Sequence, residues 1–308
     1  MTLSTNGPNS DLIYKGTTVT IEIDPHAGFC FGVDRAVHLA ESLLQKDSQA
    51  YCVGDIVHNQ KEMDRLSQLG LTFVNHQELE NQTSKKVLFR AHGEPPQSYQ
   101  LANQKQHQLT DATCPVVVKL QQRVKKAWET MINLNGQVII FGKRNHAEVL
   151  GLVGQTQNQA VVIENMNDLD AIDFSRPIEV FSQTTSSLTD YKLFCERITS
   201  KAQSTLKIND TICRQVSSRE PWLKAFVITV EVMIFVGGTK SSNAKFLHGV
   251  CKSHNPDSFL VSGVDDIQME WFAGKTRVGI SGATSTPLWQ LQEVAQWLHQ
   301  NLNEQIKN

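Results

Sequence analysis

The stretch PHAGFCFGVDRA (25–36) joins a strand-like run to a helix-like run, and the same pattern recurs along the chain. The alternating segment TVTIEI (18–23) precedes it, and the segment VDRAVHLAESLL (33–44) follows it with the spacing of an amphipathic helix. A single cysteine, Cys30, stands on the turn between them, with Gly28 and Gly32 on either side. The stretch therefore predicts a thiol presented at the carboxyl end of a strand, the edge where α/β sheets bind ligands.

Strand-like and helix-like runs alternate through almost the whole chain. Runs such as AYCVG, KKVLF, QVIIFG, IEVFS and VMIFVGG are each followed by a helix-compatible segment. Alternation of this kind is typical of parallel sheets covered by helices. The 308 residues are enough for two or three domains, and the strands are too many for one modest sheet. We therefore predict an α/β protein with more than one mostly parallel sheet.

Two further cysteines, Cys114 and Cys213, recur in the position of Cys30. Each ends a D-x-x-C segment, DATC (111–114) or DTIC (210–213), between a short strand-like run and a helix-like run. The three cysteines are 84 and 99 residues apart in the sequence, which is about one small domain each. This spacing predicts three similar α/β domains, at 18–111, 112–208 and 209–308, after a polar N-terminal tail of residues 1–17.

The number of cysteines limits the kind of metal site. The sequence contains no C-x-x-C pair, so a zinc ribbon and a thioredoxin motif are unsupported. A structural zinc ion prefers four protein ligands and leaves no open coordination position. Three thiolates on a cubane [4Fe-4S] cluster would instead leave one iron open to a substrate oxygen. The plain alternative is that a cysteine is a small core residue. We adopt that alternative for Cys52, Cys195 and Cys251, which lie inside strand-like or helix-like runs.

Small polar side chains follow many of the predicted strands. Hydroxyl, amide and imidazole groups at the ends of parallel strands could together bind an anion with many oxygens, such as a diphosphate. Serine and threonine after glycine are also common helix N-caps, and both interpretations use the same backbone N–H groups. The segment GGTKSS lacks the spacing of a P-loop. The candidate side chains are His58, His92, His146, Gln183, Thr184, Thr185, Ser241, Ser242, Asn243 and Ser285.

The bulk composition excludes several classes of protein. The chain has 29 Lys and Arg against 31 Asp and Glu, a formal net charge of −2. It therefore lacks the overall positive charge that is typical of nucleic-acid-binding proteins. It has no apolar run of membrane length, and its first residues lack the basic start and apolar core of a signal peptide. We therefore expect a cytoplasmic protein without a nucleic-acid or membrane partner, whose cysteines are thiols.

Several motifs, taken together and in order, resemble a known family. GFCFGVDRA, VHN, AHG, DATCP, the H-x-E pair, QTT, SSN and the segment STP (285–287) are similar to those of the 4-hydroxy-3-methylbut-2-enyl diphosphate reductases. The resemblance runs from about residue 18 to the C-terminal helix. It implies a trefoil of three α/β domains around a central iron–sulfur cluster. It also implies reductive removal of a hydroxyl group as water, with two electrons and two protons, to give isopentenyl and dimethylallyl diphosphate.

The resemblance also implies roles for individual residues. Glu148 would deliver protons, and Thr184 would lie next to the substrate hydroxyl. A small ferredoxin or flavodoxin would supply electrons. The cluster ligands would be Cys30, Cys114 and Cys213, and the diphosphate would be held by His58, His92, His146, Ser241, Ser242, Asn243 and Ser285.

Two positions depart from the common family pattern. Ala147 stands where the family often has proline, and Val216 stands where a hydroxyl side chain is expected after the third cysteine. Two other functions are also compatible with some of the residues. A zinc hydrolase with cysteine and histidine ligands would lack acid-labile sulfide, and an iron–sulfur redox sensor would not need a pocket of histidine, serine and asparagine.

Overall fold

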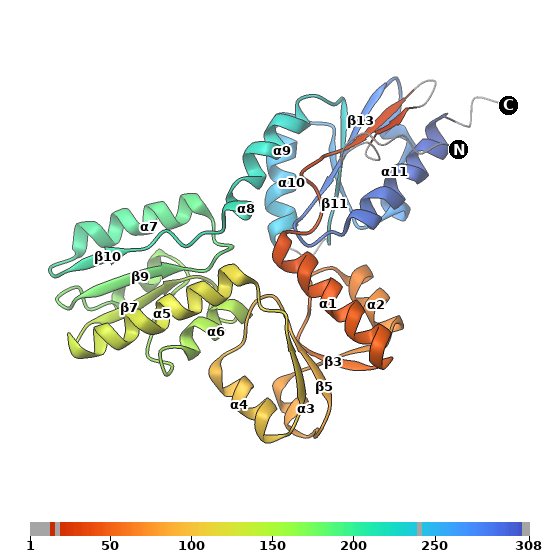
Figure 1. The fold of residues 1–308 in the computed structure, drawn as a ribbon. Coiled ribbons are helices and arrows are strands. Elements are labelled where there is room, and N and C mark those ends of the chain that lie inside the picture. Colours follow the sequence, from red (N-terminus) through yellow and green to blue (C-terminus); the bar gives the residue numbers. More distant parts are fainter. Residues whose placement is uncertain (1–12, 16–18, 239–241, 304–308) are drawn as a thin grey trace. The chain divides into compact units, whose positions relative to one another are not determined.

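The computed structural model describes residues 13–15, 19–238 and 242–303. Within these residues the strands form three sheets, and the chain divides into two compact units (Figure 1). The first unit consists of Met1–Cys30, Val57–Glu62 and Ser218–Asn308, and the second of Phe31–Ile56 and Met63–Ser217. In the described residues, no helix is both long and apolar enough to cross a membrane.

The first unit contains a five-stranded sheet with the order β1-β2-β13-β11-β12. Only β1 is antiparallel to its neighbour, and the other pairs are parallel. The strands are β1 (Ile13–Lys15), β2 (Thr20–Ile23), β11 (Val232–Val236), β12 (Ser258–Val261) and β13 (Arg277–Gly282). The helices are α9 (Arg219–Val227), α10 (Ser242–His254) and α11 (Leu288–Asn303), with short 3-10 turns η3 (Val264–Asp266) and η4 (Met269–Phe272).

Successive residues of β11 face two different cores, because side chains alternate across a strand. Ile234 packs with β2, β13 and the apolar face of α11, whose Leu291 is fully buried. Phe235 points to the other side and packs with Leu223 of α9 and Leu247 of α10. Both faces of this sheet are therefore covered, which explains why the strand VMIFV is apolar at every position.

The second unit contains two four-stranded sheets, and every strand pair in them is parallel. One sheet has the order β4-β3-β5-β6, with β3 (Ala50–Val53), β4 (Leu71–Val74), β5 (Lys86–Phe89) and β6 (Gln108–Asp111). The other has the order β10-β9-β7-β8, with β7 (Gln137–Phe141), β8 (Val161–Ile163), β9 (Ile178–Ser182) and β10 (Leu206–Ile208).

Helices connect these strands, as expected for parallel sheets. They are α1 (Phe31–Asp47), α2 (Gln60–Gln68), α3 (His76–Glu80), α4 (Pro96–Gln104), α5 (Pro115–Asn133), α6 (Ala147–Gly154), α7 (Leu188–Lys201) and α8 (Arg214–Ser217), with the 3-10 turn η2 (Met166–Ala171). Helices α5 and α7 cover opposite faces of the β7–β9 pair. Val124 of α5 packs with Ile140 and Phe181, whereas Phe194 of α7 packs with Ile139 and Val180.

The predicted α/β class with mostly parallel sheets is confirmed, but one predicted boundary is wrong. Strand β2 was expected in a domain with residues 50–111, and it pairs instead with β13. Residues 13–15 of the predicted tail form strand β1 on β2, and residues 1–12 and 16–17 lie outside the described part of the chain. The reason for the difference is that strand order depends on pairing between distant segments, which a local pattern does not encode. The remaining boundaries stay a prediction.

Candidate active site

The carboxylate of Glu148 is buried and bonded to Thr184 within the second unit. Glu148 lies in the first turn of α6 and is 1% exposed. Its Oε1 accepts a hydrogen bond from the backbone N–H of Thr184 at 2.6 Å, and its Oε2 accepts one from the Thr184 hydroxyl at 2.6 Å. Thr184 lies two residues after the end of strand β9, which pairs with β7, and Glu148 follows β7 in the sequence.

Burial raises the pKa of Glu148 to about 7, because the charged carboxylate loses its hydration. The two hydrogen bonds from Thr184 act in the opposite direction, and the burial is the larger effect. A carboxyl group with such a pKa can hold and release a proton near neutral pH, as a general acid must.

His146 caps the N-terminus of α6, so Glu148 does not have that role. The Nδ1 atom of His146 accepts a hydrogen bond from the Glu148 backbone N–H at 3.2 Å. An accepting Nδ1 is unprotonated, so in the neutral ring Nε2 carries the proton and is a donor. The ring of His92 lies edge-on to that of His146, with 5.2 Å between their centroids.

The loop that carries His92 is held from both sides. The N–H of Gly93, which has a φ of +76°, donates to the Arg90 carbonyl at 3.2 Å and closes a tight turn. The buried carboxylate of Glu94 lies 3.7 Å from Arg90 Nε and 2.7 Å from His76 Nε2. Arg90 and Glu94 flank the A-H-G motif, but no local sequence pattern marks either of them as a site residue.

Two of the three predicted cluster ligands lie in the second unit, and both are tied to neighbouring site residues. Cys114 is the N-cap residue of α5, and its N–H donates to the Ala91 carbonyl, one residue before His92, at 3.0 Å. Cys213 directly precedes α8, and its N–H donates to the Thr184 carbonyl at 2.8 Å. Backbone hydrogen bonds therefore connect each thiol-bearing turn to one of the predicted substrate-binding loops.

The first turn of α1 contacts both of these turns. The N–H of Phe31 donates to Gln215 Oε1 at 3.1 Å, and Arg35 Nη1 donates to the Thr113 carbonyl at 3.3 Å. A Cβ atom on Gly32 would lie 2.8 Å from the Sγ atom of Cys114. The N-termini of α1, α5 and α8 therefore lie together, and a cysteine directly precedes each of these helices.

These cysteines fit an iron–sulfur cluster by their chemistry and surroundings. Cys30, Cys114 and Cys213 are all of intermediate exposure. Helix N-termini favour negative charge, and so they favour thiolates and an anionic cluster. Gly32 leaves beside Cys114 the space that any side chain would fill. By contrast, burial raises the pKa values of Cys52 and Cys251 to about 12, which disfavours the thiolate form that binds metal.

Three other observations correct or refine the sequence analysis. Phe31, which directly follows Cys30, is 56% exposed. Gln183 was a candidate donor, and it instead holds its own loop, with Oε1 accepting from the Lys143 N–H at 3.1 Å and Nε2 donating to Thr185 Oγ1 at 2.6 Å. The N–H of Val216 donates to the Cys213 carbonyl at 3.1 Å, so the backbone holds this turn.

The remaining predicted site residues belong to the first unit. His58 and Asn243 are exposed, and Ser285 is half-buried after β13. Ser242 begins α10, whereas Ser241 lies outside the described residues.

Asn59, which follows His58, was missed as a structural residue of this site. Its Nδ2 donates to Gln290 Oε1 at 2.8 Å, and its Oδ1 accepts from the Glu62 N–H at 3.1 Å. The Glu62 carboxylate in turn accepts from the Trp289 indole at 2.7 Å. These contacts hold the turn after His58 on the start of α11. The V-H-N segment itself was the only signal in the sequence.

A buried, protonatable carboxyl group, an adjoining hydroxyl and cysteines that precede converging helix N-termini are features of an α/β oxidoreductase. A family model described as LytB protein matches residues 21–299. The chain therefore belongs to the LytB protein family.

Curated relatives agree with this assignment. A protein of Bacteroides fragilis named 4-hydroxy-3-methylbut-2-enyl diphosphate reductase is 44% identical over 289 residues, covering 93% of this chain and 100% of that protein. A protein of the same name from Parabacteroides distasonis is 46% identical and covers 90% of this chain and 96% of its own length.

Two solved structures are also similar. One, titled as (E)-4-hydroxy-3-methyl-but-2-enyl diphosphate reductase, the terminal enzyme of the non-mevalonate pathway, has a TM-score of 0.73 and 33% identity, covering 91% of this chain and 99% of that chain. The other, a reductase from Plasmodium falciparum, has a TM-score of 0.78 and 26% identity, covering 91% and 88%. The predicted family, its reductase function and its place in isoprenoid biosynthesis are confirmed. The zinc hydrolase and the redox sensor are not supported.

Proposed function

We propose that this chain removes the hydroxyl group of 4-hydroxy-3-methylbut-2-enyl diphosphate as water and forms isopentenyl and dimethylallyl diphosphate. The reaction consumes two electrons and two protons. The observation that carries the proposal is the buried carboxyl group of Glu148, hydrogen-bonded to Thr184, whose carbonyl accepts from the N–H of Cys213. Thr184 alone therefore joins Glu148, a possible proton source, to Cys213, whose thiol can bind a redox centre.

Cys30, Cys114 and Cys213 would hold a [4Fe-4S] cluster through three thiolates. When bound, the cluster supplies electrons and one iron without a protein ligand that acts as a Lewis acid. The contacts of Phe31 and Gly32 with the Cys213 and Cys114 turns support this ligand set, because Cys30 is joined directly to Phe31. The helix N-termini behind the thiols would stabilise the cluster's negative charge.

Neutral donors would bind the diphosphate. His146 offers the Nε2–H that results from its capping role, and His92 lies against it. Neutral imidazole and hydroxyl groups can donate hydrogen bonds to a diphosphate without carrying a positive charge. The product would then be held less tightly than by lysine or arginine and could dissociate. The other residues proposed for this role are His58, Ser241, Ser242, Asn243 and Ser285.

Glu148 would hold the proton that leaves with the substrate hydroxyl. In the structure the Thr184 hydroxyl donates to Glu148 Oε2. When Glu148 is protonated, its O–H donates to Thr184 Oγ1 instead, and the Thr184 hydroxyl turns its own hydrogen toward the substrate oxygen. The pair could therefore pass a proton from the buried carboxyl group to the substrate. An anionic substrate would raise the pKa of Glu148 further, because like charge disfavours ionisation.

The electrons would come from a small ferredoxin or flavodoxin in the cytoplasm. The reaction is tested with anaerobically purified, iron-loaded protein and reduced methyl viologen as an artificial donor. Substrate-dependent dye oxidation, with both diphosphate products identified by mass spectrometry, is the expected result. Iron-loaded protein that oxidises no dye with this substrate would overturn the proposal.

A further inference from the structure

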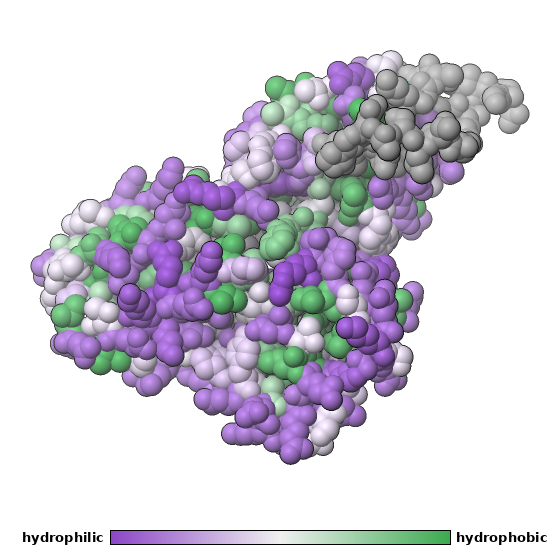
Figure 2. Space-filling model, in the orientation of Figure 1, coloured by the Kyte–Doolittle hydropathy of each residue, from purple (hydrophilic) through white to green (hydrophobic). Residues whose placement is uncertain are grey.

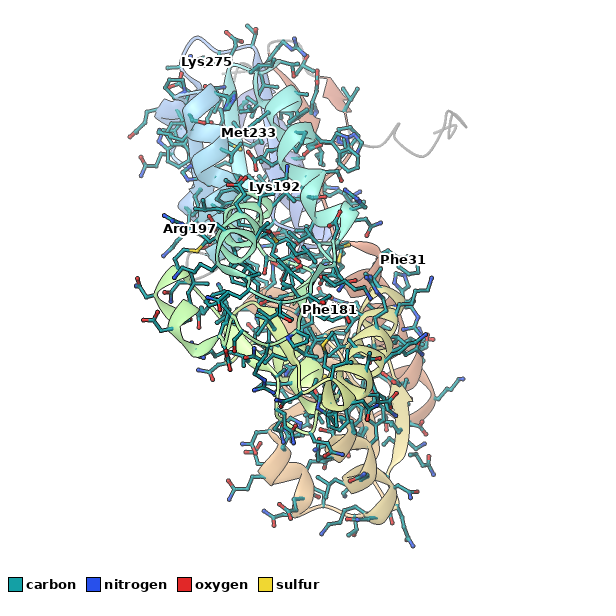
Figure 3. The ribbon with its side chains drawn as sticks, turned by 90° about the vertical axis from the view of Figure 1, so that its left-hand side faces the viewer. Phe31, Phe181, Lys192, Arg197, Met233 and Lys275 are labelled. Atoms are coloured by element: carbon teal, nitrogen blue, oxygen red, sulfur yellow. The ribbon has the colours of Figure 1, made fainter. Side chains whose placement is uncertain are left out.

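Exposed side chains of the second unit follow each of the three cysteines in the sequence. Phe31 comes directly after Cys30 and is 56% exposed, and Val116 comes two residues after Cys114 and is 44% exposed. Gln215, two residues after Cys213, is exposed as well and is bonded to the backbone of Phe31. Figure 3 shows Phe31 at the edge of the molecule in that view. Two apolar side chains are thus presented outward where the helix N-termini meet.

Helix α5 adds a basic stripe to this surface. Lys119, Arg123 and Lys126 are exposed, and with Val116 they recur at the spacing of one helix face. The helix carries four basic residues and one acidic residue, although the whole chain has 29 basic and 31 acidic residues. Figure 2 shows hydrophilic residues gathered over α5. The outward face of α5 is therefore positive in a protein that is slightly negative overall.

From these observations, and resting on the proposed function, we infer that Phe31, Val116 and the basic stripe of α5 form the docking surface for a small acidic one-electron carrier protein. Electron transfer slows steeply with distance, so a carrier must dock close to the cysteines. Transient redox complexes bury little surface, and a small apolar centre with a charged rim is enough to orient them. Opposite charge also accelerates the encounter.

The electron count requires two carrier molecules for each turnover. Each reduced carrier loses one electron, and the substrate takes up both electrons and two protons as its C–O bond breaks and water leaves. The surface must therefore release the first oxidised carrier before the second docks. Charged residues at the edge of an interface allow such rapid exchange of carriers, because they raise the association rate without making the complex long-lived.

The test is Lys119→Glu in the iron-loaded enzyme, with a bacterial flavodoxin as the probe. The matched control is Lys192→Glu, since Lys192 is exposed on α7, which covers the opposite face of the same sheet. Isothermal titration calorimetry at low salt measures the affinity for flavodoxin. We expect Lys119→Glu to weaken it roughly fivefold, with the difference shrinking at high salt, and Lys192→Glu to leave it unchanged.

Turnover with two donors separates this inference from the proposed function. Methyl viologen needs no docking surface, so Lys119→Glu and Val116→Ser should keep dye-driven turnover while flavodoxin-driven turnover falls. If neither substitution changes flavodoxin affinity or flavodoxin-driven turnover, the docking surface is wrong even though dye-driven turnover is normal. If the unaltered enzyme fails with the dye as well, the proposed function is wrong.

Discussion

The N–H of Cys213 donates to the carbonyl of Thr184 at 2.8 Å, and this bond links a proposed cluster ligand to the hydrogen-bond partner of Glu148, the proposed proton donor. The hydroxyl of the same threonine donates to Glu148 at 2.6 Å. A shift of the Cys213 turn would therefore move Thr184 and disturb the carboxyl group. This coupling gives the site its fixed geometry, which reactions that combine electron and proton delivery require.

Replacing Glu148 with glutamine should abolish most turnover without damage to the site. The amide keeps the size of the carboxyl group and can still bond Thr184, but it cannot release a proton. We expect normal iron content, retained diphosphate binding and turnover lower by on the order of a hundredfold. Glu179→Gln is the control, because Glu179 is another buried glutamate on β9 that is paired with Lys207. Near-normal turnover in Glu148→Gln would leave the proton source unidentified.

The pH dependence of kcat/KM, which reports the free enzyme, should follow the protonation of Glu148. The carboxyl group acts in its protonated form, and its pKa is about 7 because of burial. The active fraction therefore falls as pH rises through 7, by about tenfold for each further pH unit. Stopped-flow measurement of dye oxidation at low substrate concentration, from roughly one pH unit below neutrality to roughly two above it, checks the slope. A flat profile over this range would contradict the assignment.

Gly32→Ala should reduce iron binding, since the added Cβ would lie 2.8 Å from the Sγ atom of Cys114. The thiol or the first turn of α1 would have to move, and the ligand set would no longer match the cluster. Gly249→Ala on α10 is a suitable control, because a Cβ there meets no atom within 4 Å. In a helix this change should stabilise the fold by roughly 0.5–1 kcal/mol. Equal iron content in both variants, measured with acid-labile sulfide, would argue against Cys114 as a ligand.

The two groups of cysteines should differ in their effect on iron content. Serine at position 30, 114 or 213 should deplete the cluster, because hydroxyl groups bind iron–sulfur clusters poorly. Alanine at position 52, 195 or 251 should leave the cluster in place, since these thiols pack among strands and helices. Iron loss from a folded variant of the second group would point to a different ligand set.

Substitutions of His146 should separate its two roles. Both His146→Ala and His146→Asn remove the imidazole and should weaken binding of inorganic diphosphate by roughly tenfold. Only alanine removes the N-cap of α6, at a cost of about 1 kcal/mol in the free energy of unfolding. His58→Ala and His92→Ala should also weaken diphosphate binding. Unchanged diphosphate affinity in all of these variants would exclude the proposed anion pocket.

The sequence by itself determined the chemistry available to this protein. The strand–helix alternation predicted parallel α/β sheets, and the positions of Cys30, Cys114 and Cys213 before helices agree with the structure. These features are local, since a turn residue and the helix after it are adjacent in the chain. The ordered motifs also identified the family without any knowledge of distances.

Only the tertiary structure decided the pairing of β2 with β13, in which Thr20 lies opposite Arg277. It also decided that His146 caps α6 while Glu148 is buried against Thr184. Strand order and burial depend on contacts between segments far apart in the chain, and no local pattern encodes them. The raised pKa of Glu148 follows from the same cause, because a carboxyl group loses its water only when the whole fold closes around it.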